Sequence, residues 1–257
     1  MLKSKRFIYL VLLLMPALAF SQQWQAESGD RQVAVLELFT SEGCGLCPAA
    51  DKWVETTAHQ NIVDGNLIVL GFHIDYLNDK KGWIDKYAKA KFSERQRQLA
   101  RLNLYKTVYT PEFVISGEVV HNWRKHAKEV IKAVNGFKPE ADISVTVKQE
   151  QERLSVKTNI TIEGDENKQY SKLYLAVVED NLVNKVNGGD NAGKTFNHQH
   201  LVRDWIGPLA LNESGASELV TEIKLDKDWS LEQTRIVALV QNLEDGFVLQ
   251  SLVIPLK

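Results

Sequence analysis

Cysteine is scarce in this sequence, which has two in 257 residues, together with two methionines and six prolines. Two cysteines are too few for a disulfide framework or for a zinc site built from four thiolates. An excess of charge of one sign is also missing, because 31 Lys and Arg residues stand against 33 Asp and Glu residues. The net charge of −2 offers no electrostatic basis for binding nucleic acid or an anionic membrane. The remaining composition, 44% hydrophobic, is that of a globular protein.

The longest apolar run lies at the N-terminus. Basic residues precede an apolar stretch over residues 7–15, and Ala17 and Ala19 fit the A-x-A pattern of a cleavage site. These features predict a secretory signal peptide over residues 1–19. The run ends at Phe20 and is shorter than the ~20 residues of a spanning helix, which disfavours a membrane anchor. We therefore expect a periplasmic or secreted protein without a membrane span after cleavage, in a compartment where disulfides persist.

The chain after the signal peptide begins with residues 20–32, which are polar and predict a loose arm. From residue 33 to residue 138, short apolar runs alternate with segments of helical spacing, which predicts an α/β domain. The expected strands span residues 33–39, 67–74 and 113–115, and the expected helices lie within residues 47–59, 83–104 and 124–135.

The character of the sequence changes after residue 138. Apolar and polar residues now alternate, first at Ile143, Val145 and Val147, and the alternation recurs in short segments up to Ile254. Short alternating strands separated by turn residues predict an all-β, immunoglobulin-like sandwich domain over residues 139–257.

One stretch of this second domain, residues 181–217, is long, polar and rich in glycine. A sandwich has no topological need for so long a connection, and long loops persist where they bind or cover something. We therefore expect this stretch to fold back onto the first domain near Cys44, with Arg203 making a buried contact between the domains. The alternative is an exposed loop at the far end of the sandwich.

The two cysteines, Cys44 and Cys47, lie three residues apart where a buried strand meets a helix. As a purely structural cross-link, a disulfide between near neighbours contributes only ~2 kcal/mol, against ~5 kcal/mol for a 100-residue loop. At a helix N-terminus, free N–H groups and the helix dipole favour the thiolate of Cys44. Cys44 would then attack a substrate disulfide, and the more buried Cys47 would resolve the mixed disulfide.

The order of strand, Cys44-x-x-Cys47, helix and later Thr110-Pro111 before another strand resembles the thioredoxin superfamily. The wider pattern, which includes residues 36–44 and residues 73–76, resembles a bacterial family of secreted thioredoxin-like proteins with no assigned function. This resemblance covers most of residues 33–120 and implies no reaction. It implies a thioredoxin-like first domain and a cis peptide bond at Pro111 facing the cysteines.

Several other polar residues accompany this motif. Glu37 lies inside an apolar strand, and thioredoxins carry a buried acid near the matching place, so Glu37 is a candidate base for Cys47. The alternative for Glu37 is a salt bridge with Arg or Lys. His73 and Asp75 lie at the end of the second strand, at the sheet edge where α/β folds collect ligands. The candidate substrate-binding residues are Thr110, Pro111, His73, Asp75 and Tyr76.

The predicted function is thiol–disulfide exchange, as by a thiol–disulfide oxidoreductase, on exported proteins that bear thiols or disulfides. We predict no cofactor, no resident metal and no nucleic-acid partner, and the sequence does not determine the oligomeric state. One alternative is a soft-metal protein in which Cys44, Cys47 and His73 bind copper. Another is a thioredoxin-fold module that binds partners without turnover. Whether the protein is an enzyme stays open, because the two leading readings use the same thiols.

Overall fold

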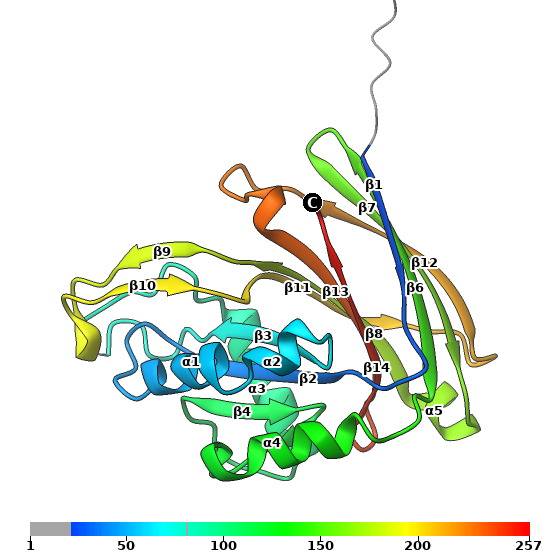
Figure 1. Cartoon of the computed structure of the whole chain (residues 1–257), viewed down its shortest axis with the longest axis horizontal. Helices are drawn as coiled ribbons and strands as arrows, with labels where there is room; N and C mark the ends of the chain where they lie inside the picture. The colour runs from blue at the N-terminus through cyan, green and yellow to red at the C-terminus, as the bar shows by residue number, and fades with distance from the viewer. Residues whose placement is uncertain (1–21, 81) are drawn as a thin grey trace, which may run out of the picture.

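The structure is a computed structural model that describes residues 22–80 and 82–257 (Figure 1). The predicted signal peptide, residues 1–19, lies outside the described residues. The fold is mixed α/β and consists mostly of strands, arranged in an eight-stranded, a four-stranded and a two-stranded sheet. Within the described part of the chain, no helix has the length and apolar character needed to cross a membrane.

The eight-stranded sheet runs through both halves of the chain (Figure 1). Its strands in spatial order are β14 (Val248–Pro255), β13 (Thr234–Asn242), β8 (Ser171–Glu179), β11 (Leu201–Ala210), β3 (Leu67–His73), β2 (Ala34–Thr40), β4 (Glu112–Ile115) and β5 (Glu118–Val119). The parallel strands β2 and β3 are buried along their whole length. Their almost unbroken apolar runs predict this, because helices or strands cover both faces.

The two halves of the chain meet where β11 runs parallel to β3, with Leu201 opposite Gly71. A Cβ atom at position 71 would lie 3.2 Å from the carbonyl oxygen of His200, so glycine permits this close approach. The predicted domains, residues 33–138 and 139–257, therefore share one sheet, whereas the sequence predicts two separate ones. The thioredoxin-like and immunoglobulin-like character of the two halves stays a prediction.

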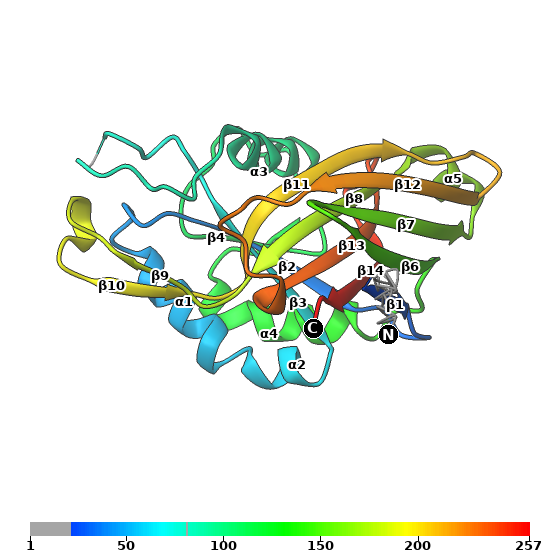
Figure 2. The same ribbon diagram turned by 90° about the horizontal axis from the view of Figure 1, so that it is seen from above.

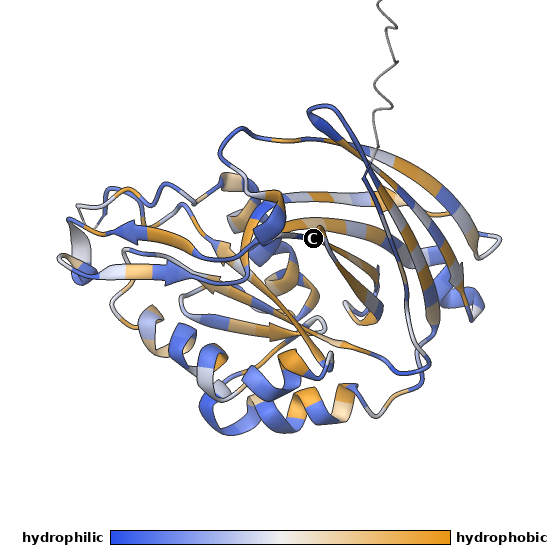
Figure 3. Ribbon diagram, turned by 45° about the horizontal axis from the view of Figure 1, so that its top comes forward, coloured by the Kyte–Doolittle hydropathy of each residue, from blue (hydrophilic) through white to orange (hydrophobic). Residues whose placement is uncertain are grey.

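The four-stranded sheet packs against the second half of the large sheet. Its strands in order are β1 (Gln23–Glu27), β6 (Ala141–Glu150), β7 (Arg153–Ile162) and β12 (Ala216–Lys224). All neighbours are antiparallel. Ile143, Val145 and Val147 point inward and share a core with Leu175 and Ile236 of the large sheet. Alternating hydrophobic and hydrophilic colours along β6 and β7 show the same arrangement, which explains the alternation in the sequence (Figure 3).

The predicted loose arm, residues 20–32, contains an ordered strand. Along its whole length β1 pairs with β6. Trp24 and Ala26 pack against the core between the sheets, and the polar residues between them are exposed. Two apolar residues make too short an alternation to indicate a strand by sequence alone, and the pairing partner lies more than 100 residues away.

Helices cover both faces of the first half of the large sheet (Figure 2). On one face of β2, α1 and α4 pack through Ala50, Val54 and Ala127. On the other face, α3 packs through Phe92 and Leu99. The helices are α1 (Cys47–Thr56), α2 (His59–Val63), α3 (Ala90–Leu102), α4 (Trp123–Val134) and α5 (Asp165–Tyr170), with 3-10 turns η1 (Gly189–Asn191) and η2 (Leu231–Gln233).

Two segments differ from the secondary structure that the sequence predicts. The helix predicted within residues 83–104 begins only at Ala90, and the segment before it forms a loop. The stretch predicted as a long excursion, residues 181–217, contains the hairpin of β9 (Leu182–Lys185) and β10 (Thr195–His198). Figures 1 and 2 show this hairpin extending beside α1.

Candidate functional site

Cys44 and Cys47 form a disulfide between the end of β2 and the start of α1. Their Cα atoms are 5.4 Å apart. Cys47 is the first residue of α1, and among the described residues no side chain caps this helix end. Cys44 is 6% exposed and Cys47 is 1% exposed. The pair therefore lies at the predicted strand–helix junction, with Cys44 the more accessible of the two.

Glu42, two residues before Cys44, is the centre of a buried hydrogen-bond network. Its carboxylate accepts from Nδ2 of Asn184 at 2.8 and 2.9 Å and from Nε1 of Trp83 at 2.9 Å. Nε2 of His198 lies 2.8 Å from the same carboxylate, and burial keeps the pKa of His198 below its usual value. Burial also acts to raise the pKa of Glu42, but these hydrogen bonds outweigh it and hold the pKa below its usual value.

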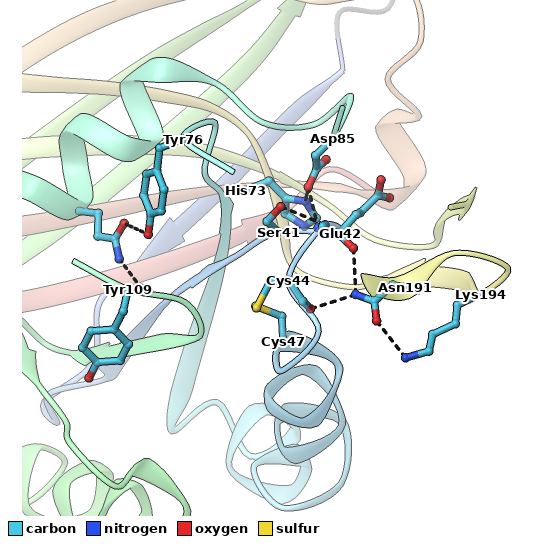
Figure 4. Close-up of a disulfide and its surroundings, with 12 residues drawn as sticks. Ser41, Glu42, Cys44, Cys47, His73, Tyr76, Asp85, Tyr109, Asn191 and Lys194 are labelled. Carbon is cyan, nitrogen blue, oxygen red and sulfur yellow. Dashed lines mark hydrogen bonds and ion pairs between the residues drawn. A yellow bond between two sulfur atoms is a disulfide. The ribbon is translucent and has the colours of Figure 1, made fainter. Parts of the chain in front are cut away.

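Asn191 connects the second half of the chain to the cysteine loop (Figure 4). Its Nδ2 donates to the carbonyl oxygens of Glu42 at 2.8 Å and of Cys44 at 2.9 Å, and the side chain is fully buried. Nζ of Lys194 donates to the amide oxygen of Asn191 at 2.9 Å. These contacts confirm that part of the stretch over residues 181–217 folds back onto the first half near Cys44. The prediction of one long loop is wrong for residues 201–210 of this stretch, which form β11 of the large sheet and pair with β8.

Asn191→Ala is expected to lower the free energy of unfolding by about 1–3 kcal/mol, because it removes a donor from two buried carbonyl groups. Denaturant unfolding of the oxidised protein measures this loss. Asn197→Ala, at an exposed position of β10 in the same hairpin, is the matched control and should stay within about 0.5 kcal/mol of wild type. Equal stability of the two variants would show that the contact of Asn191 with the cysteine loop contributes nothing.

Arg203 forms its ion pairs within the second half of the chain, and not between the two halves as the sequence predicts. Its guanidinium pairs with Glu179 and Asp228 at 2.7 Å each, and both carboxylates belong to the second half. From the first half, the ring of Tyr87 lies 5.9 Å from the guanidinium, and Lys89 donates to the backbone carbonyl of Arg203. The ion pairs of Arg203 therefore stabilise the second half itself, because that half supplies both neutralising carboxylates.

His73 lies at the end of β3, in a buried pair with Asp85. Its Nδ1 is 2.7 Å from Oδ2 of Asp85, and that oxygen also accepts from the backbone N–H of Glu42 at 2.8 Å. Burial acts to lower the pKa of His73, but the charge of Asp85 outweighs it and raises the pKa above its usual value. The disulfide sulfur points toward the side of Tyr109 and not toward His73 (Figure 4). His73 and Asp85 thus hold the cysteine loop in place from behind.

Asp75 and Tyr76 follow β3 and bind to α3. The hydroxyl of Ser93 donates to the Asp75 carboxylate and accepts from its backbone N–H, so Asp75 fixes the start of α3. The Tyr76 hydroxyl donates to Oε1 of Gln96 at 3.1 Å, and Nε2 of Gln96 donates to the carbonyl of Tyr109 at 2.8 Å. Tyr76 and Tyr109 lie on the side to which the sulfur points (Figure 4). The Asp75 carboxylate is instead bound to Ser93 of α3.

Thr110 and Pro111 lie directly before β4. Because Phe39 of β2 pairs with Glu112 of β4, Pro111 comes beside the end of β2, where the cysteine loop starts. The Thr110–Pro111 peptide bond is cis. Burial raises the pKa of the neighbouring Glu112 carboxyl to about 7, against the opposing effect of a hydrogen bond from Gln96. The two residues thus share the sheet edge with the cysteines.

Glu37 lies on the face of β2 opposite to α1. The alternate residues Leu36 and Leu38 pack beneath α1, so Glu37 points toward α3, since successive side chains of a strand face opposite sides. There it forms a two-pronged salt bridge with Arg95, at 2.8 and 2.7 Å. This is the predicted alternative for Glu37, and the arrangement turns its carboxylate away from Cys47.

Sequence reasoning missed most of the network that surrounds the disulfide. Asn184, Asn191 and His198 lie more than 140 residues from the loop that they bind, so no local spacing indicates the contact. The sequence did not indicate the contact of Asp85 with His73, because Asp85 was expected within a helix. Asp51 lines a cavity together with His73 and His198. Its position could have been found from the sequence, since it follows Cys47 by four residues and a helix brings such positions together.

A family model described as "Protein of unknown function (DUF1223)" matches residues 35–241. The chain belongs to this family. The match begins in β2 and reaches into β13, so the family includes both halves of the large sheet. The prediction of a family with no assigned function is confirmed, and its thioredoxin-like character remains a proposal.

Two solved structures share the fold. HBP35 of Porphyromonas gingivalis is similar with a TM-score of 0.67 and 16% identity, over 88% of this chain and 75% of that chain. Protein AGR_C_4864 from Agrobacterium tumefaciens is similar with a TM-score of 0.62 and 21% identity, over 88% of this chain and 96% of that chain. Among curated proteins, none matches the sequence. At these identities the similarity concerns the fold alone.

Proposed function

We propose that this protein exchanges disulfides with exported proteins through Cys44 and Cys47. The observation that carries the proposal is a disulfide at the start of α1, in which Cys44 is the more accessible partner. In the reduced protein, the dipole and free N–H groups of α1 favour the thiolate of Cys44. The buried charge of Glu42 opposes this effect, so we expect a moderately acidic thiol.

Exposed apolar side chains beside the disulfide support a polypeptide as substrate. Leu46, between the two cysteines, is 71% exposed, and Tyr109, on the side to which the sulfur points, is 41% exposed. An extended substrate segment could lie over these side chains while its own sulfur reaches Cys44. We assign Thr110, Pro111 and Tyr76 to the same binding surface, because they share this sheet edge.

We place this exchange in the periplasm or outside the cell. The predicted signal peptide and the intramolecular disulfide both support that location, because disulfides persist in oxidising compartments. The first half of the chain would act as a thioredoxin-like domain, with β2, α1 and β4 presenting the cysteines. The second half would hold the cysteine loop through Asn184, Asn191 and His198.

Equilibration with glutathione tests the exchange function. We expect the Cys44–Cys47 disulfide to open and close reversibly, with a reduction potential above about −300 mV, because structural disulfides of secreted proteins lie below that value. Acid quenching, alkylation and mass spectrometry at a series of glutathione ratios measure the potential, and the Cys44→Ala/Cys47→Ala variant provides the baseline. A potential below this limit would mark the disulfide as structural and remove the proposal.

The soft-metal alternative has less support. Nδ1 of His73 is already bound to Asp85, and the disulfide sulfur points away from His73. Within residues 22–80 and 82–257, no group of three or more His, Cys, Asp or Glu residues could hold a metal ion. Titration of the reduced protein with copper(I) separates the two functions, since only the metal protein requires His73 for tight binding.

A further inference from the structure

Asp51 is one helical turn beyond Cys47 and is half-buried at the edge of the buried face of α1. Cys47, Ala50 and Val54 are the neighbouring buried positions of this face, and side chains four residues apart on a helix lie about 5–6 Å apart at Cβ. Cys47 is 1% exposed, so a proton that leaves its thiol needs a carrier. Asp51 is the carboxyl group placed next to this thiol along the helix.

Asp51 also lines a cavity of about 330 Å³. It is large enough for several water molecules, at roughly 30 Å³ each. Asp51 and Pro48 of α1 line it, together with His73 of β3 and His198 of β10. Asp51 thus follows the buried Cys47 by one turn of α1 and also lines a space through which a proton can reach solvent.

The titratable and charged groups around Asp51 lie on α1, at the end of β3, and in and just after β10. Burial raises the pKa of Asp51 to about 7, the charge of His73 opposes this shift, and the charge of Glu55 adds to it. Lys52 of α1, His198 of β10 and His200 also line the cavity, and burial lowers the pKa of His200 to about 4. A carboxyl group that titrates near neutral pH can both accept and return a proton under ordinary conditions.

We propose that Asp51 accepts the proton of the Cys47 thiol when Cys47 resolves a mixed disulfide, an inference that rests on the proposed function. In this step the Asp51 carboxylate takes the proton, directly or through one water. The Cys47 thiolate attacks Sγ of Cys44, the bond from Cys44 to the substrate sulfur breaks, and the Cys44–Cys47 bond forms. The substrate disulfide has then gained two electrons, and its second sulfur leaves as a thiolate. In the reverse direction Asp51 returns the proton to Cys47.

A single-turnover reaction with 5,5′-dithiobis(2-nitrobenzoate) isolates this step. The reduced full-length protein first forms an adduct at Cys44 at pH 4, and a jump to higher pH starts the attack by Cys47. Release of the second thionitrobenzoate, followed by absorbance, gives the rate of resolution. The probe carries its own disulfide, so the assay does not depend on a physiological substrate.

Asp51→Asn is expected to slow this release about 10-fold or more at pH 7.5. Asp51 helps only as the carboxylate, so its contribution is present above pH 7 and is lost as the pH falls through about 7. The wild-type and Asn rates should therefore converge below pH 6, and again above pH 9, where Cys47 ionises without help. Glu55→Gln, the control on the same helix, should keep the step in the pH profile and move it to slightly lower pH.

Identical pH profiles for wild type and Asp51→Asn would overturn the role of Asp51 and leave exchange by the two cysteines intact. If no adduct forms at Cys44, or no protein releases the second thionitrobenzoate, the proposed function itself fails. Should Asp51→Asn not fold, an NMR titration of the carboxyl carbon of Asp51 in the reduced wild-type protein tests the proton role instead. Titration near pH 7 supports the proton role, and titration near pH 4 contradicts it.

Discussion

Cys47→Ala is expected to accumulate Cys44 in mixed disulfides with exported proteins, where the wild-type protein shows almost none. The variant keeps the attacking thiol of Cys44 but lacks the sulfur that would release the substrate, so the intermediate cannot resolve. Non-reducing gels of cell extracts, quenched with acid and an alkylating reagent, should show a ladder of adducts that collapses on reduction. Mass spectrometry of these bands identifies the partner proteins.

The control for this experiment is Cys44→Ala/Cys47→Ala, which lacks both thiols and should form no adducts. Cys44→Ala alone should form few, because Cys47 is 1% exposed and cannot reach a bulky partner. Adducts that persist without Cys44 would assign the attacking role to Cys47. A variant with Cys44 intact and no adducts would favour the metal or binding alternatives over exchange.

Arg95→Met is expected to lower the free energy of unfolding by about 3–5 kcal/mol, because it leaves the buried carboxylate of Glu37 without its partner. The Glu37 and Arg95 side chains are 1% and 0% exposed. The guanidinium also lies over the rings of Tyr174 and Trp205, at 4.7 and 4.9 Å from their centroids. The salt bridge therefore connects β2, α3 and the second half of the chain. Denaturant unfolding at pH 7 measures the loss.

Arg95→Met/Glu37→Leu is the matched control, since it removes both charges and should recover most of the lost stability. The same pair separates the structural from the catalytic reading of Glu37. If Glu37 serves only the salt bridge, the double variant should resolve the Cys44 adduct at the wild-type rate. A slow double variant would return Glu37 to the role of base for Cys47.

Local patterns predicted the elements that carry the cysteines. The apolar runs at residues 33–39 and 67–74 became β2 and β3, because strands buried on both faces need apolar side chains throughout. The pair Cys44 and Cys47 lies at the predicted strand–helix junction. The alternation from Ile143 onward became β6 and its neighbours, since one face of that sheet is buried and the other is exposed.

The face of the sheet on which a side chain lies was harder to predict. Glu37 sits inside an apolar run, and such a run contains no alternation that would assign its side chain to either face of the sheet. The positions of α1 and α3 decided it, by covering opposite faces of β2. The prediction of a helix from residue 83 was wrong for its first turns, and contacts distant in sequence again explain the difference. Trp83 and Asp85 form hydrogen bonds with Glu42, which hold their segment outside the helix.

The sequence by itself determined β2, β3 and the alternating strands from β6 onward, the helix that starts at Cys47, the position of the cysteine pair and the return of part of residues 181–217 to that pair. These follow from periodicity, from spacing within one turn of helix and from the length of one connection. The sequence did not indicate β1, β9, β10 or β11. Only the tertiary structure decided that both halves share a sheet, that Glu42 is bound by Asn184 and His198, and that Glu37 faces Arg95. Hydrogen bonds between groups over 140 residues apart depend on chain crossings that no local pattern records.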